Sequence, residues 1–244
     1  MWREFFTYGL NQTLTAGNGT VFQANNIRLD SDADFEAHKL TYHATSGNVR
    51  TRLRTDQGLY LMKQEVNLRN IAGNFAGTPF IFPRPHAFVA GSNLIVESAD
   101  RSGGANTLRW TFMGAKIRQG TAPWDRRYRA VRPFTYSVDE TRVAANQTAS
   151  LRIEIDTDSH FLVQKITGTK EGNCLVEFKE GGRDLDWQNT PLHFETIIGN
   201  GQFPNVLFAN RFVRRGLVLV IQIQDLSGLS NLVEVALHGV KMYE

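Results

Sequence analysis

The sequence contains a single cysteine, Cys174, among its 244 residues. One thiol excludes an internal disulfide framework and any zinc cluster built from several cysteines. No apolar run approaches the roughly 18 residues that a membrane-spanning helix needs, since the longest one, 217–221, ends at Gln222. The first six residues lack the apolar core of a secretory signal, so we expect folding in a reducing cytoplasm and no membrane partner.

The chain also lacks an excess of charge of one sign. Its 27 lysines and arginines against 24 aspartates and glutamates give a formal net charge of +3. This balance is too weak for nucleic-acid binding through bulk charge, so we expect no nucleic-acid partner. Two local arginine clusters are interpreted as solvated basic loops, with phosphate contact as the alternative. They are Arg126, Arg127, Arg129 and Arg132, and further on Arg211, Arg214 and Arg215.

What the sequence does contain is a match between its two halves. Asp30-Ser-Asp32 recurs as Asp156-Thr-Asp158, a shift of 126 residues, and after Pro79 the same register continues with a shift of 125. The matched pairs include Phe6 with Phe134, Tyr8 with Tyr136, Lys39 with Lys165, Asp100 with Asp225, Asn106 with Asn231 and Gly114 with Gly239. This period is far longer than the about 20 to 50 residues of a solenoid repeat, so the match predicts a tandem duplication of a whole domain.

The local pattern within each half is that of β-strands. Apolar and polar residues alternate along 108–112, and the matched segment 233–237 repeats the alternation. An Asp-x-Ser-Gly turn precedes each of these segments, and its glycine suits a backbone position with positive φ. The only window that also fits a helix is 59–71, and Pro191 in the matched segment argues against a helix there.

These patterns predict an all-β chain of two tandem homologous β-sandwich domains, jelly-roll or Greek-key-like, produced by an internal duplication. The expected organisation is an N-terminal arm plus the first sandwich over residues 1–118, a linker over 119–132, and the second sandwich over 133–244.

No arrangement of residues predicts catalysis, and we expect no catalytic residues, no cofactor and no metal site. The histidines show no ligand spacing, and strand alternation would point His38 and His43 in opposite directions. The run Asp30–Asp34 offers three carboxylates to calcium, but the second half keeps only two, so a solvated turn is the preferred interpretation. Cys174 is interpreted as a buried structural thiol because Val49 fills the matched position.

Aromatic residues supply the candidate interaction sites. Trp110 and Trp187 match apolar residues of the other half, which predicts core positions for both. The remaining candidates lack matched copies, so we expect them to contact other proteins. They are Trp2 and Phe5 in the N-terminal arm, Phe80 and Phe82 in an expected contact loop, and the linker residues Trp124, Arg126, Arg127, Tyr128 and Arg129, of which Trp124 and Tyr128 are also candidates for stacking on sugars.

The segment from Phe203-Pro204 through 215–220 and Asp225–Gly228 to Asn231–Lys241 resembles a β-sandwich module of tailed-bacteriophage structural proteins. The first half repeats this pattern between Pro79 and Lys116. Such modules occur in small virion components of the head, neck or tail. The resemblance therefore implies a non-enzymatic part of a symmetric particle.

The leading hypothesis is a bacteriophage virion structural protein, either a capsid decoration or cement protein or a neck or collar component. Its expected partners are further copies of itself and other virion proteins, such as the major capsid or neck and tail proteins, and its expected location is the virion after synthesis in the host bacterial cytoplasm. The alternative is a tandem carbohydrate-binding module that contacts host glycans, and a hydrolase with an unrecognised site is a third hypothesis.

Overall fold

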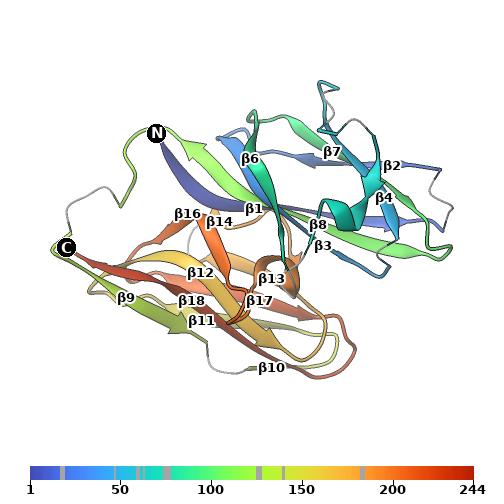
Figure 1. Ribbon diagram of the computed structural model, residues 1–244. Coiled ribbons are helices and arrows are strands. Elements are labelled where there is room, and N and C mark those ends of the chain that lie inside the picture. Colours follow the sequence, from blue (N-terminus) through green and yellow to red (C-terminus); the bar gives the residue numbers. More distant parts are fainter. Residues whose placement is uncertain are drawn as a thin grey trace.

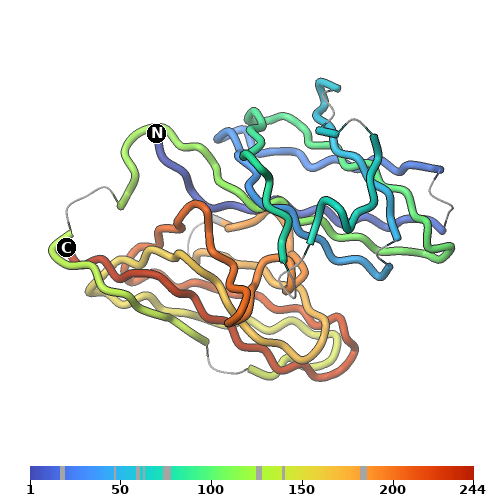
Figure 2. Tube along the Cα trace, viewed as in Figure 1, coloured from blue at the N-terminus to red at the C-terminus, as the bar shows by residue number. Residues whose placement is uncertain are grey.

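The computed structural model describes residues 1–16, 20–46, 48–58, 61–62, 64–73, 78–124, 128–138, 141–181 and 185–244. The chain forms two β-sandwiches that lie against each other, coloured blue to green for the first half and yellow to red for the second in Figure 1. Apart from two single-turn helices, the described elements are strands, which confirms the predicted all-β class. Both chain termini lie at the same side of the molecule (Figure 2).

The first half is an eight-stranded jelly roll within the described residues. One sheet has the order β1-β8-β3-β6 and the other β2-β7-β4-β5, so strands distant in sequence become neighbours. The strands are β1 (Trp2–Leu14), β2 (Gln23–Arg28), β3 (Asp34–Ala44), β4 (Val49–Thr55), β5 (Val66–Asn67), β6 (Phe80–Phe88), β7 (Asn93–Asp100) and β8 (Asn106–Arg118).

The second half has the same strand order with small additions. Its sheets run β9-β18-β12-β16 and β11-β17-β13-β14, with β10 also on β18 and β15 also on β13. The strands are β9 (Ala130–Ser137), β10 (Thr141–Val143), β11 (Thr148–Glu154), β12 (His160–Lys170), β13 (Cys174–Glu180), β14 (Leu185–Asp186), β15 (Leu192–His193), β16 (Asn205–Val213), β17 (Val218–Asp225) and β18 (Asn231–Tyr243).

The strand register also agrees between the halves. The pairing of β3 with β8 is interrupted between Ala37 and Lys39, and the pairing of β12 with β18 is interrupted between Val163 and Lys165. These are the positions that the sequence match superposes. The tandem duplication stays a prediction about the origin of this correspondence, and the term "equivalent" below refers to matched positions in the two strand registers.

One polar tie occurs in both halves. The hydroxyl oxygen of Tyr8 accepts a hydrogen bond from the amide of Asp30 at 2.9 Å, and the Asp30 carboxylate forms an ion pair with Lys116 at 2.6 Å. In the second half the hydroxyl oxygen of Tyr136 accepts a hydrogen bond from the amide of Asp156, and the Asp156 carboxylate forms an ion pair with Lys241. These contacts fix the turn at Asp30 to β1 and β8, and the turn at Asp156 to β9 and β18. Partial burial raises the pKa of both tyrosines, so their hydroxyl groups stay protonated.

Each half has its own apolar core. In the first, Phe35, Trp110 and Phe112 are fully buried between the two sheets. In the second, Phe178 stacks on Trp187 with ring centroids 5.3 Å apart. The predicted core positions of Trp110 and Trp187 are therefore confirmed, with both at 0% exposure.

The outer faces of the two main sheets differ. Along β8 the burial alternates until Trp110 and is then continuous through Lys116, because both faces of the strand are covered. Along the equivalent strand β18 the alternation persists through Leu237. The first half therefore buries its outer sheet face against the second half, whereas the second half leaves the equivalent face open.

The expectation of no helix near residue 191 is wrong. A single turn, α1 (Phe194–Ile197), follows Pro191, and a 3₁₀ turn, η1 (Leu68–Asn70), occupies the equivalent place in the first half. Pro191 lies before α1 and does not interrupt its hydrogen bonds, which removes the argument against a helix.

We predict that Gly239→Ala destabilises the protein by about 1–3 kcal/mol, because a methyl group there collides with the carbonyl oxygen of Leu162 across the β12–β18 pair. Urea denaturation measures the loss. Gly104→Ala is the matched control: nothing lies near its added methyl group and the equivalent residue is Leu229, so a change within about 0.5 kcal/mol is expected. Equal effects of the two substitutions would contradict the prediction.

Candidate functional site

The two halves meet along the edge of β1. The amide of Thr7 donates to the carbonyl of Trp187 at 3.0 Å, and the amide of Asn189 donates to the carbonyl of Thr7 at 3.3 Å. The amide of Gly9 donates to the Asn189 side chain at 2.6 Å. Segment 187–189 of the second half thus pairs with a sheet edge of the first half whose backbone groups would otherwise be open.

Lys39 is the buried cation of this junction. Its ammonium group, on β3, donates to Asn205 Oδ1 at 3.1 Å and to the carbonyl oxygen of Val206 at 2.6 Å, both on β16 of the second half. It also lies 4.8 Å from the ring centroid of Phe208. Burial lowers the pKa of Lys39 to about 8, because the charged form is poorly solvated there. The side chain fastens one half to the other.

Three threonines add neutral hydrogen bonds beside Lys39. Thr41 Oγ1 donates to the carbonyl of Thr196 at 2.8 Å, and Thr111 Oγ1 donates to Thr196 Oγ1 at 2.9 Å. All three residues are fully buried. A polar contact of this kind requires matched geometry, so it fixes the relative orientation of the halves.

A buried ion network closes the other end of the junction. Arg211 on β16 is 2% exposed, and its guanidinium binds Glu180 and Glu4 at 2.9 Å each, so its interpretation as part of a solvated basic loop is wrong. It also donates to the carbonyl of Phe5 at 3.4 Å and lies 5.5 Å from the ring centroid of Trp187. Because Glu4 belongs to the first half and Glu180 to the second, the positive charge of Arg211 compensates a carboxylate on each side of the junction.

A polar cleft of about 360 Å³ opens between the halves next to this network. In it, Lys116 binds Asp30 and Asp32, and Arg118 binds Asp32 at 2.7 Å and Glu4 at 3.0 Å. Partial burial opposes ionisation of Asp32, but the hydrogen bonds from Arg118 and Lys116 outweigh it and lower its pKa. These charged side chains form ion pairs with one another, so they stabilise the packing of β1 and β8 against the turn at Asp30 and Asp32.

Two histidines stack across the junction. The rings of His43 and His193 lie 3.6 Å apart and 10° from parallel. Burial lowers the pKa of His193 to about 2, with further repulsion from His43, Lys170 and Arg109, and burial also lowers the pKa of His43. The pair is therefore neutral at pH 7. His38 also contacts the second half, stacking on Phe208 at 4.8 Å, so the expectation that His38 and His43 point in opposite directions is wrong, and the β3 interruption between Ala37 and Lys39 is the reason.

The equivalent face of the second half is open. It forms a hollow of about 580 Å³ on the sheet of β9, β18 and β12. Its lining residues are Pro133, Phe134, Thr135, Gln164, Lys165, His238, Gly239 and Val240. Thr135 and Lys165 are exposed here, whereas their equivalents Thr7 and Lys39 are buried in the junction. The sequence comparison matches Lys39 with Lys165 but gives no sign that one is covered and the other is not.

The predicted N-terminal arm does not exist as a separate segment. Residues from Trp2 onward form β1, paired with β8 along its whole length. Phe5 is 2% exposed and packs edge-on against Trp187 in the core of the second half, so it is not available to another protein. Trp2 is half-buried and packs edge-on against Trp124 at 5.2 Å. Its role in an interface stays a prediction.

The predicted contact loop at residues 80–85 is instead part of β6, an edge strand of the first sheet. Phe80 and Phe82 are half-buried and pack against the core of the first half. Pro83 and Pro85 are tolerated because an edge strand has one side without ladder hydrogen bonds. The pairing with β3 is interrupted along β6, since Ala37 pairs with His86 and Lys39 pairs with Ile81, so residues 82–85 have no partner in β3.

The predicted linker candidates lie in different environments. Trp124 and Tyr128 are half-buried, and Tyr128 donates to the carbonyl of Pro123 at 2.9 Å, so the expectation of exposed aromatic rings is wrong. Arg129 is exposed, and its amide donates to the carbonyl of Tyr243. Arg126 and Arg127 lie outside the described residues.

The remaining sequence candidates take structural positions. Cys174 is buried as predicted, and burial raises the pKa of its thiol to about 12. Within the described ranges no three histidine, cysteine, aspartate or glutamate side chains gather as a metal site. No helix in the described part of the chain is long and apolar enough to cross a membrane.

No protein-family model and no curated protein matches this sequence. Solved structures with some similarity include the major capsid protein P2 of bacteriophage PM2, with a TM-score of 0.29 and 13% identity over 96% of this chain and 98% of that one. A triple jelly-roll protein of an archaeal virus gives a TM-score of 0.30 and 9% identity over 96% and 59% of the chains. The tandem CBM22 domains of Xyn10C from Paenibacillus barcinonensis give 0.20 and 10% over 98% and 93%. These scores are low, and the jelly-roll description rests on the strand order of this chain.

The buried histidine pair predicts acid destabilisation. Since the pKa of His193 is lowered by folding, the unfolded chain binds more protons below about pH 6.5, and stability is present above that pH and lost as pH falls. We expect the free energy of unfolding to drop by about 2 kcal/mol between pH 8 and pH 5 through His193. The variant His193→Phe keeps the ring stack and loses this part of the pH dependence, measured by urea denaturation at each pH. An unchanged pH profile in the variant would refute the assignment.

The ion pairs of the Asp30–Asp34 run predict that chelation has no effect. Lys116 and Arg118 compensate Asp30 and Asp32, so the fold does not depend on a bound cation. Thermal unfolding with and without EDTA is expected at the same temperature. A fall of several degrees on chelation would contradict the prediction and would favour a bound divalent cation such as calcium.

Proposed function

We propose that the protein is a non-enzymatic structural component of a bacteriophage virion, either a capsid decoration protein or a neck or collar component. The observation that carries the proposal is the way the two jelly rolls are joined. Buried polar contacts from Lys39, Thr41 and Arg211 fasten them into one block. Such a block suits a load-bearing part of an assembly, where the geometry between domains must be kept.

The polar residues shared by the halves support this role. The tie of Tyr8, Asp30 and Lys116 recurs with Tyr136 and its neighbours, and both copies hold strands and turns together. Asp100 and Asp225 likewise accept hydrogen bonds from the serine and glycine of their own turns. The matched positions thus serve the scaffold, whereas an active site needs acids, bases and nucleophiles that converge on a substrate.

The resemblance of the sequence to β-sandwich modules of tailed-bacteriophage proteins supports the virion assignment. The two predicted sugar-stacking residues give the carbohydrate-binding alternative no support, because the rings of Trp124 and Tyr128 are half-buried and packed against neighbouring groups.

Incorporation into particles tests the proposal. Purified protein is added to phage particles that lack it, and the expected result is saturable binding at a fixed number of copies per particle, measured by quantitative mass spectrometry. Failure to bind any particle, together with clear binding on a glycan array, would overturn the proposal.

A charge reversal tests the predicted interface within the same assay. Arg129→Glu is expected to weaken attachment about tenfold if this exposed residue lies in the contact. Arg142→Glu is the matched control, since Arg142 is exposed on β10, outside the predicted interface residues. Equal attachment of both variants would remove Arg129 from the interface.

A further inference from the structure

The junction between the halves uses two different surfaces. The first is the outer face of the β1-β8-β3-β6 sheet, with Thr7, Lys39 and Thr41 at its centre. The second is made by α1 and the start of β16, which offer the carbonyl groups of Thr196 and Val206. The contact is therefore head-to-tail, because a sheet face of one half meets a helix-and-strand surface of the other.

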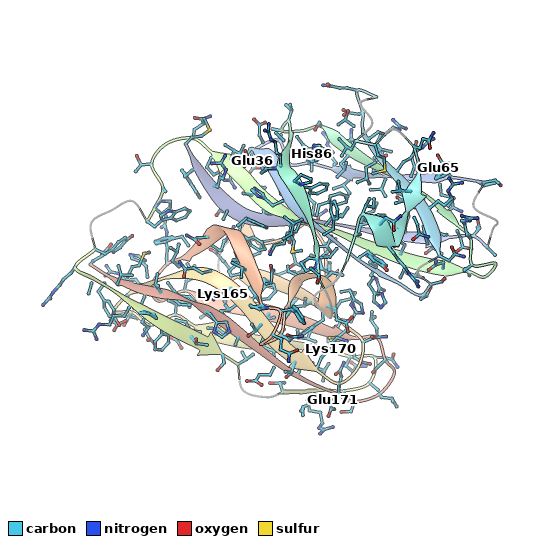
Figure 3. The ribbon with its side chains drawn as sticks, viewed as in Figure 1. Glu36, Glu65, His86, Lys165, Lys170 and Glu171 are labelled. Atoms are coloured by element: carbon cyan, nitrogen blue, oxygen red, sulfur yellow. The ribbon has the colours of Figure 1, made fainter. Side chains whose placement is uncertain are left out.

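Each half carries its own version of both surfaces. The sheet face of the second half places Thr135, Lys165 and Thr167 at the positions of Thr7, Lys39 and Thr41. Lys165 is exposed there, beside the hollow of about 580 Å³. Figure 3 labels this lysine on the second half, on strand β12. No segment of the described chain covers this face as α1 and β16 cover its equivalent.

The first half carries the free version of the other surface. Strand register places Ile81 on β6 at the position of Val206, and the sequence match places Asn70 in η1 at the position of Thr196 in α1. Ile81 is 53% exposed, and Val206 is 47% exposed although its carbonyl accepts from Lys39, so the junction uses the main-chain carbonyl at this position and leaves the side chain largely open. The labelled His86 marks the same strand in Figure 3, on the half opposite Lys165.

We infer that a second copy of this chain docks head-to-tail, with the Lys165 face of one molecule on the η1–β6 surface of the next. The contact repeats one part of the junction already present within the chain, in which a lysine of the sheet face donates to a carbonyl at the start of the opposing strand. The second acceptor of Lys39, Asn205, has Phe80 at the equivalent position. In the docked pair, Lys165 would donate to the carbonyl of Ile81, as Lys39 does to that of Val206. The inference rests on the proposed structural role and names its partner.

The chemistry of the two surfaces is the reason why a second copy of the chain can bind to either of them. The sheet face presents the Lys165 ammonium group, and the hydroxyl groups of its Thr135 and Thr167 bind His238. The η1–β6 surface presents the side chain of Ile81 and the rigid rings of Pro83 and Pro85, and Arg69 and Arg84 are exposed beside them. Since the surfaces differ, a pair of molecules leaves one of each unused. Further copies can therefore add until a ring closes.

Sedimentation velocity of the full chain over a concentration series tests the inference. The wild type is expected to associate with increasing concentration. Lys165→Glu, which removes the donor, and Ile81→Arg, which places a cation opposite Lys165, are each expected to raise the dissociation constant about 100-fold. Arg152→Glu is the matched control, because Arg152 is exposed on β11 of the other sheet. It is expected to associate like the wild type. Coincident thermal melts of all variants establish that they are folded.

A mixture of the two variants tests directly whether the sheet face of one molecule binds the η1–β6 surface of another. Lys165→Glu keeps an intact η1–β6 surface and Ile81→Arg keeps an intact sheet face, so each is monomeric alone and the mixture forms a one-to-one dimer that does not grow. A wild type that stays monomeric to about 1 mM, or a mixture that does not dimerise, would overturn the inference. Incorporation of such a monomer into particles would leave the proposed function standing, whereas self-association without incorporation would reject the proposed function alone.

Discussion

The structure depends on the covering of one sheet face. The outer face of the β1-β8-β3-β6 sheet holds the ammonium group of Lys39 and the hydroxyl groups of Thr41 and Thr111, all buried. Such groups are costly to remove from water unless they find acceptors, and their acceptors lie on Asn205, Val206 and Thr196 of the other half. The first jelly roll is thus completed by the second, and the two apolar cores are joined through these buried polar contacts.

This dependence explains which features the sequence predicts well. Strand alternation at 108–112, the Asp-x-Ser-Gly turns and the core positions of Trp110 and Trp187 are set by neighbours within a few residues or within one sheet. The matched halves reveal the shared register, because both sequences satisfy the same sandwich. Patterns of this kind follow from the chain itself, and the strand order of a jelly roll agrees with them.

The contacts between the two halves could not be predicted from sequence patterns of this kind. Thr7 meets Trp187 and Lys39 meets Val206, contacts between residues far apart in the chain that no local alternation encodes. Phe5 therefore looks like an unmatched surface aromatic in the sequence and is buried in the structure. The signal that was available is the repeated Lys39 and Lys165, a charged residue kept at matched strand positions, and it does not tell which copy is covered.

The pairing of β1 with segment 187–189 has a consequence for synthesis of the protein. Translation delivers the N-terminal strand first, and its edge stays open until Asn189 has left the ribosome. During that interval the nascent first half presents an unpaired strand edge and the apolar ring of Phe5, the features that favour aggregation between chains. Closure of the edge also joins residues separated by most of the chain, which makes it a slow step. The order in which the chain emerges therefore makes the first half the one that a chaperone would need to protect.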